Sequence, residues 1–142
     1  MILYLDTSAL VKLYVEEAGS ARTRELVDRS DGAYTSRISY VEARAAFARR
    51  LRAQAMSRRE HGDIVSRFEA GWSGFGVVEL SDPLARSAGT LAEKHGLRAL
   101  DATQLAAALE LRTGSVPVDF ACFDRRLAHA AREERLPLAA SL

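Results

Sequence analysis

The chain has 142 residues, 48% of them hydrophobic, and its formal net charge at pH 7 is +1, which fits one ordinary soluble domain spanning residues 1–142. No stretch approaches the roughly 20 apolar residues of a membrane span, and Asp6 interrupts the apolar start that a signal peptide needs, so we expect a cytoplasmic protein. Cys122 is the only cysteine, which excludes an internal disulfide and a thiolate-based zinc site.

Predicted strands and helices alternate along the chain. The apolar run 2–5 is typical of a strand covered on both faces, and a helix capped by Thr7 or Ser8 is expected to follow it to about Glu17. Further strands are predicted at 33–36, 76–80 and 118–122, with a short edge strand at 136–140. Further helices are predicted at 21–29, 38–54, 58–68, 82–95, 101–112 and 125–134. The pattern predicts an α/β fold, a single domain with a mainly parallel central sheet of four to five strands and about seven flanking helices.

Two acids lie where such a sheet would form a binding site. Asp6 directly follows the first predicted strand, and sites in parallel sheets form outside the carboxyl ends of the strands. Glu42 lies near the start of the long helix and has no basic residue three or four positions away, so a helical ion pair does not explain it. If Ser39 caps the helix, Glu42 completes a capping box; if Ser36 is the cap, Glu42 lies in the second turn and can reach the cleft.

Two more acids follow in the second half of the chain. Asp101 starts the alanine-rich segment DATQLAAALELR, and Asp124 comes shortly after the strand predicted at 118–122. Each has an ordinary explanation, because an acid near a helix N-terminus contributes about 0.3–1 kcal/mol and an N-cap about 1 kcal/mol. Asp119 competes with Asp124, but it lies near the start of its strand and thus toward the far end of the sheet, so we favour Asp124.

The four acids are therefore expected to meet at one edge of the sheet. Two carboxylates about 4 Å apart repel each other by about 4 kcal/mol at an effective dielectric near 20, so some stay protonated or a cation is bound. Oxygen ligands without histidine or thiolate suit Mg²⁺ or Mn²⁺. These ions can activate a water and stabilise charge on a phosphate, so the pattern predicts metal-dependent hydrolysis of a phosphodiester.

Four segments carry a resemblance that spans nearly the whole chain: YLDTSALVKLY, TSRISYVEARAAF, LRALDATQLAAAL and FACFDRRLAHAA. With these segments in family order, the sequence resembles the PIN-domain ribonucleases and, among them, the VapC-like toxins of bacterial toxin–antitoxin pairs. The resemblance implies a Mg²⁺-dependent (or Mn²⁺-dependent) endoribonuclease that acts on RNA. It also implies a homodimer and a cognate antitoxin that inactivates it by inserting a segment into or near the cleft.

The resemblance also assigns roles to individual residues. Asp6 and Asp101 are expected to be the principal metal ligands, and Ser8 to hydrogen-bond within the acidic cluster. Glu42 is expected to bind the metal directly or through a water and to help orient the attacking water. Asp124 completes the pocket or holds a second ion. Cys122 departs from the family, in which a threonine more often stands two residues before the last acid.

Basic residues should flank an acidic site that takes RNA. Arg125 and Arg126, next to Asp124, are the predicted RNA contacts, although solvated helix residues would look the same. The arginine-rich segment 44–67 is equally well explained as a phosphate-binding surface or as a solvated helix face or antitoxin surface.

Two other functions fit part of the pattern. An aspartyl-nucleophile phosphatase or receiver domain would use Asp6 as the phosphorylated group. Ser8 stands where such phosphatases have a second aspartate, and Lys94 lies within a predicted helix, which argues against this function. A PIN-like module that binds protein or RNA without catalysis is the other alternative, and metal binding distinguishes it from a nuclease.

Overall fold

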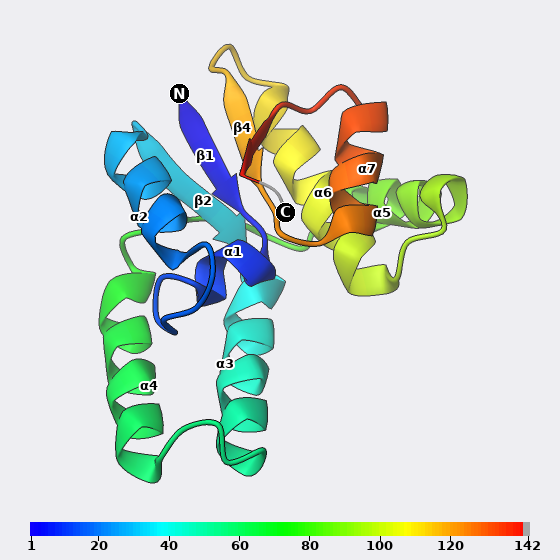
Figure 1. The fold of residues 1–142 in the computed structure, drawn as a ribbon. Helices are drawn as coiled ribbons and strands as arrows, with labels where there is room; N and C mark the ends of the chain where they lie inside the picture. Colours follow the sequence, from blue (N-terminus) through cyan, green and yellow to red (C-terminus); the bar gives the residue numbers. More distant parts are fainter. Residues whose placement is uncertain (141–142) are drawn as a thin grey trace.

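The computed structural model describes residues 1–140. Its centre is a sheet of five parallel strands in the spatial order β3-β2-β1-β4-β5 (Figure 1). The strands are β1 (Ile2–Leu5), β2 (Gly32–Ser36), β3 (Gly76–Val78), β4 (Val118–Ala121) and β5 (Leu138–Ala140). The first strand of the sequence is thus the central strand of the sheet, and its carboxyl end lies between those of β2 and β4.

Seven helices surround this sheet within residues 1–140. They are α1 (Thr7–Val11), α2 (Ser20–Arg29), α3 (Arg37–Arg52), α4 (Arg58–Trp72), α5 (Asp82–His95), α6 (Ala99–Arg112) and α7 (Arg125–Glu133). Helices α3 and α4 form an antiparallel arm that extends beyond the carboxyl end of the sheet (Figure 1). None of the described helices combines the length and the apolar character that crossing a bilayer requires. The α/β architecture, the parallel sheet and the number of helices are confirmed.

Two apolar cores lie on opposite faces of the sheet. Tyr4 packs in the core formed with α5, α6 and α7, whereas Leu3 and Leu5 pack in the core formed with α1, α2, α3 and α4. All three side chains are fully buried because successive side chains of a strand point to opposite faces and both faces are covered. The uninterrupted apolar run at the start of the chain therefore reflects a central strand.

The first helix differs from its prediction at both ends. Its N-cap is Asp6, whose carboxylate accepts a hydrogen bond from the Ala9 N–H, and the helix ends at Val11 instead of near Glu17. The Ser20 hydroxyl accepts a hydrogen bond from the Glu17 N–H and donates one to the Val15 carbonyl. These side-chain hydrogen bonds take the place of helical pairing, so the chain turns before α2 begins.

Two other boundaries shift for identifiable reasons. Helix α4 continues to Trp72, beyond its predicted end at 68, because the Trp72 ring packs against Tyr40 and Phe68, with ring centroids 5.3 and 5.5 Å apart. Helix α6 begins at Ala99, so Asp101 lies in its first turn and is not its first residue. Its acidic side chain remains in the part of the helix that the macrodipole favours.

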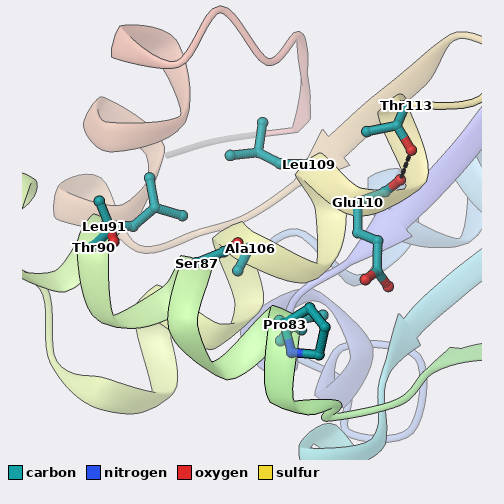
Figure 2. Close-up of a pocket in the computed structure, with 9 residues that line it drawn as sticks. Pro83, Ser87, Thr90, Leu91, Ala106, Leu109, Glu110 and Thr113 are labelled. Carbon is teal, nitrogen blue, oxygen red and sulfur yellow. Dashed lines mark hydrogen bonds between the residues drawn. The ribbon is translucent and has the colours of Figure 1, made fainter.

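A groove of about 440 Å³ lies between α5 and α6 and is lined largely by apolar side chains, among them Leu91, Ala106 and Leu109 (Figure 2). None of the four predicted site acids lines this groove. The acids gather at a different place, at the carboxyl end of the sheet.

Candidate active site

A pocket of about 300 Å³ lies where the carboxyl ends of the central strands meet the nearby helices. We call it the acidic pocket because all four predicted site acids line it, namely Asp6, Glu42, Asp101 and Asp124. The competing Asp119 is paired with Leu3 in the interior of the sheet and does not line the pocket. The structure thus brings the four acids together from parts of the chain that are far apart in sequence.

Asp6 is the most deeply buried of these acids, with 4% of its surface exposed. Its Oδ1 accepts hydrogen bonds from the Ala9 N–H at 2.9 Å and from the Ser8 hydroxyl at 2.6 Å. Burial raises the pKa of Asp6 to about 6 although these hydrogen bonds oppose the shift, and the negative charge of Glu42 raises it further. A carboxylate in this position is stabilised by any cation that binds next to it.

Ser8 and Cys122 connect Asp6 to the end of β4. The Ser8 hydroxyl, which donates to Asp6, also accepts a hydrogen bond from the Phe123 N–H at 3.0 Å. Burial raises the pKa of the Cys122 thiol, so the thiol stays protonated and lies against the Asp6 carboxylate. The Cys122 sulfur also accepts a hydrogen bond from the Asp124 N–H at 3.4 Å.

The structure distinguishes the two interpretations of Glu42. Ser36 is the N-cap of α3, and its hydroxyl accepts a hydrogen bond from the Ile38 N–H, so the alternative capping box with Ser39 is not formed. Glu42 therefore lies in the second turn and reaches the acidic pocket. Its Oε1 accepts hydrogen bonds from the Thr7 hydroxyl at 2.8 Å and from the Gln104 amide at 3.0 Å.

Asp101 and Asp124 both lie at the beginnings of helices. Asp101 Oδ2 accepts a hydrogen bond from Arg98 Nε at 3.1 Å. Asp124 is the N-cap of α7, and its Oδ1 accepts a hydrogen bond from the Leu127 N–H at 2.9 Å. The ordinary explanation of Asp124 as a cap is thus correct, and the same residue also lines the acidic pocket.

Two polar residues of the pocket, Thr7 and Gln104, were missed by the sequence analysis. Gln104 follows Asp101 by three residues and therefore lies on the same face of α6. Its side chain is 2% exposed, in a helix face otherwise made mostly of alanine and leucine. A polar residue on such an apolar face is the sequence signal that could have indicated it.

Two of the predicted basic residues, Arg49 and Arg50 of the arginine-rich segment 44–67, line the pocket. Neither Arg125 nor Arg126 lines it, and Arg126 donates a hydrogen bond to the Gly96 carbonyl at the end of α5 at 2.7 Å. The cations that do line the pocket are Lys12, Arg49, Arg50 and Arg98.

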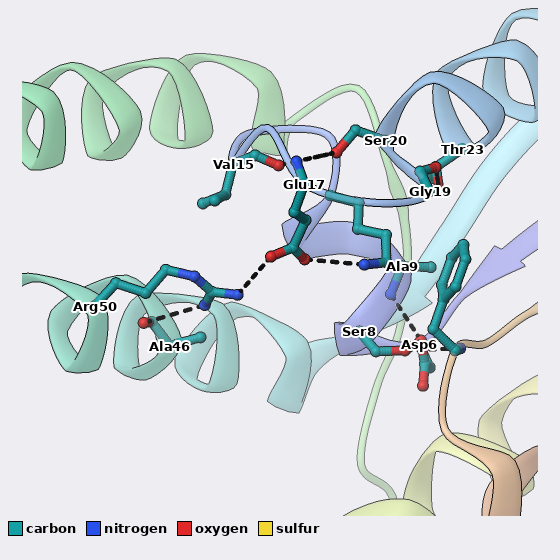
Figure 3. A network of polar contacts seen from close by, with 12 residues as sticks. Asp6, Ser8, Ala9, Val15, Glu17, Gly19, Ser20, Thr23, Ala46 and Arg50 are labelled. Atoms are coloured by element: carbon teal, nitrogen blue, oxygen red, sulfur yellow. Dashed lines mark hydrogen bonds and ion pairs between the residues drawn. The ribbon is translucent and has the colours of Figure 1, made fainter. Parts of the chain in front are cut away.

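Glu17 bonds two of these cations at the edge of the pocket. Its carboxylate lies 3.0 Å from Lys12 Nζ and 3.1 Å from Arg50 Nη2. Figure 3 shows the contact between Glu17 and Arg50, with Asp6 and Ser8 close by. Part of the positive charge around the pocket is therefore neutralised from within the chain.

Comparison with known proteins agrees with this arrangement. The PIN domain pattern matches residues 3–133 of the chain. Two Mycobacterium tuberculosis proteins, Ribonuclease VapC45 of strain CDC 1551 and Ribonuclease VapC49 of strain H37Rv, are each 40% identical to it over 133 residues, which cover 92% of this chain and 91% of theirs. The chain belongs to the PIN-domain family, among the VapC-like ribonucleases.

Solved structures with this PIN fold include toxin–antitoxin proteins. FitAcB from Neisseria gonorrhoeae matches with a TM-score of 0.70 at 20% identity, over 97% of this chain and 96% of that one. A toxin–antitoxin complex from Klebsiella pneumoniae matches with a TM-score of 0.63 at 17% identity, over 86% of each chain. These similarities establish the fold.

VapC-type PIN ribonucleases are metal-dependent, and the donor atoms of the acidic pocket suit a divalent cation. Within residues 1–140, however, no three histidine, cysteine, aspartate or glutamate side chains form a cluster that holds a metal ion as they stand. The four acids lie around the wall of the pocket, where Arg98 bonds Asp101 and the α7 N-terminus bonds Asp124. The acidic pocket thus fits a divalent cation in the type of its donor atoms.

Proposed function

We propose that this VapC-like ribonuclease cleaves RNA with Mg²⁺, or Mn²⁺, bound by the four acids of the acidic pocket. The observation that carries the proposal is that these carboxylates converge on one pocket from four separate elements of the fold. Their mutual repulsion in a partly buried site favours a bound cation, and oxygen ligands favour a hard divalent ion. As a PIN-domain endoribonuclease toxin, the protein hydrolyses phosphodiester bonds in RNA.

Each acid has a distinct part in this mechanism. When bound, the ion supplies charge stabilisation at the phosphate and lowers the pKa of a nearby water. Hydrogen bonds from the Ser8 hydroxyl and the Ala9 N–H to Oδ1 hold the Asp6 carboxylate in one orientation, which also fixes the position of Oδ2 relative to the pocket. Asp101 is the other principal ligand, Glu42 binds the ion directly or through a water and helps to orient the attacking water, and Asp124 completes the pocket or holds a second ion.

The cations around the pocket are the proposed contacts for the RNA backbone. Arginine and lysine bind phosphate oxygens without regard to base sequence, so they supply affinity and orientation. Arg49 and Arg98 line the pocket beside the acids, whereas Arg125 and Arg126 do not, which supports Arg49 and Arg98 as the contacts. A substrate of this kind also favours the cytoplasmic location expected from the sequence.

An antitoxin is the expected protein partner, because solved neighbours of the same fold are toxin–antitoxin complexes. We further propose a homodimer that the antitoxin inactivates by placing a segment in or near the acidic pocket. Exposed apolar side chains beside the pocket support a protein contact there. Val41 is 67% exposed and Leu100 is 49% exposed, and both line a second pocket that shares Thr7, Glu42 and Arg49 with the first.

The proposal is tested by incubating the purified protein with total cellular RNA in Mg²⁺ and in EDTA. Discrete fragments that require Mg²⁺ and that Asp101→Asn does not produce are the expected result. Asp119→Asn, which removes an aspartate outside the pocket, is the matched control and should cleave like the wild type. Cleavage that persists in Asp101→Asn refutes the site. No cleavage together with no Mn²⁺ binding by calorimetry supports a binding module without catalysis.

A further inference from the structure

Gln104 is the centre of a buried network of polar side chains. Its Oε1 accepts a hydrogen bond from the Tyr4 hydroxyl at 2.6 Å. Its Nε2 lies within hydrogen-bond distance of three oxygens, those of Ser39 at 2.9 Å, Thr7 at 3.0 Å and Glu42 at 3.0 Å. The network therefore joins the central strand, α1 and α3 to a single side chain of α6.

The surroundings fix which way the Gln104 amide points. Tyr4 donates to the amide oxygen from one side, and the Glu42 carboxylate requires a donor on the other side. In the reversed orientation the amide oxygen would face the carboxylate oxygen of Glu42, and two acceptors would repel each other. The amide nitrogen is thus presented to Glu42.

Both of these hydrogen bonds to Glu42 end on the same oxygen. Thr7 and Gln104 donate to Oε1, whereas Oε2 accepts no hydrogen bond from residues 1–140. The carboxylate is therefore held by one oxygen while the other is left available in the acidic pocket.

We propose that Gln104 is a positioning residue that, together with Thr7, holds Glu42 by Oε1 so that Oε2 is presented to the metal ion, directly or through a water. This inference rests on the proposed function, because it takes Glu42 to be part of the metal site. A glutamate side chain that is already ordered loses less conformational entropy when the ion binds.

The neutral charge of the Gln104 amide also favours metal binding by Glu42. An amide N–H orients the carboxylate without cancelling its charge, whereas a lysine or arginine at position 104 would compete with the ion. Asp101 illustrates the contrast, because Arg98 bonds it with a formal positive charge. The donors to Glu42, by contrast, are the neutral side chains of Thr7 and Gln104.

The first measurement is the Mn²⁺ affinity of the full-length protein by titration calorimetry, without RNA. Gln104→Met keeps the approximate length of the side chain and removes its donor, and the Mn²⁺ dissociation constant should rise about 10- to 100-fold. Thr7→Val removes the other donor to Oε1 and should shift the affinity in the same direction. The control is Thr90→Val, which makes the same change at an exposed threonine of α5 outside the acidic pocket and should leave Mn²⁺ affinity unchanged.

The second measurement separates positioning from loss of fold. In Gln104→Met the Mg²⁺ concentration for half-maximal RNA cleavage should rise with the dissociation constant, and saturating Mg²⁺ should restore activity. If circular dichroism shows that Gln104→Met is unfolded, the Mn²⁺ affinities of Gln104→Glu and Thr7→Val are measured in its place. Weaker Mn²⁺ binding by both of these folded proteins supports the inference.

Two results would overturn the inference, and they are distinguishable. If Glu42→Gln weakens Mn²⁺ binding but the Gln104 and Thr7 variants bind as tightly as the wild type, Gln104 has no positioning role and the proposed function stands. If Glu42→Gln itself leaves Mn²⁺ binding unchanged, Glu42 is not part of the metal site, and the inference fails with that assignment.

Discussion

Replacing Asp6 by asparagine should make the metal-free protein more stable at neutral pH. The Asp6 carboxyl is nearly completely buried, and burial raises its pKa from the ordinary value of 3.8 to about 6. Asparagine removes the charge but keeps an oxygen that can accept the hydrogen bonds from Ser8 and from the Ala9 N–H. The cap of α1 is therefore retained while the buried charge is lost.

The size of the effect follows from the shift in pKa. Because the folded pKa lies above the unfolded one, the contribution of Asp6 to stability is fully present below pH 3.8 and is lost as the pH rises through about 6. A shift of about two units, at about 1.4 kcal/mol each, corresponds to about 3 kcal/mol at pH 7. This is the upper end of the gain expected for Asp6→Asn in the absence of metal.

The assay is urea unfolding followed by circular dichroism at pH 4.5 and at pH 7, in EDTA and in Mg²⁺. In EDTA, the advantage of Asp6→Asn should be larger at pH 7 than at pH 4.5. In Mg²⁺, the wild type should gain stability because the ion binds only the folded protein, and Asp6→Asn should gain less. An Asp6→Asn protein that is less stable than the wild type at pH 7 in EDTA would refute the reasoning, since the buried charge would then not be unfavourable.

Three further variants test other parts of the structure. Glu17→Gln removes the carboxylate that bonds Lys12 and Arg50, so both cations become available to RNA phosphates. The RNA affinity measured by fluorescence anisotropy should rise and depend more steeply on salt concentration, and an unchanged salt dependence would contradict this. Arg49→Ala should weaken RNA binding, whereas Arg126→Ala should lower the melting temperature and leave RNA affinity unaltered; the reverse result would restore the sequence-based assignment. Leu105→Ala truncates a fully buried side chain between α6 and the sheet and should lower the free energy of unfolding in urea by about 2–5 kcal/mol. A decrease below about 1 kcal/mol would show that the surrounding core repacks to fill the space.

Much of the fold was predictable because its signals are local. The apolar run 2–5 indicates a strand covered on both faces, and Pro83 at the start of the helix Asp82–His95 marks a boundary that the structure reproduces. The first helix was mispredicted because Asp6, Thr7 and Ser8 can all act as caps. Which of them does so depends on contacts with segments distant in sequence, such as the bond from the Phe123 N–H to Ser8.

The four acids that line the pocket were predicted because strand ends and the family segments point to them. Gln104 was not, because a neutral amide gives no sign of its partners, which lie 100 residues away at Tyr4 and 62 residues away at Glu42. Arg126 is a different case. It lies beside Asp124 in the sequence, yet its side chain bonds Gly96, 30 residues away, so neighbours along the chain need not share a site.

The arm formed by α3 and α4 joins the sheet at the start of α3 (Figure 1), and Glu42 lies six residues into that helix. At 1.5 Å per residue, Glu42 lies about 8 Å from the start of α3, and Arg52 at its far end lies about 23 Å from that start. A rigid tilt about the start of α3 therefore displaces Glu42 only about one third as far as the tip. A displacement of the tip by several ångströms through such a tilt would therefore move Glu42 by only about a third of that distance.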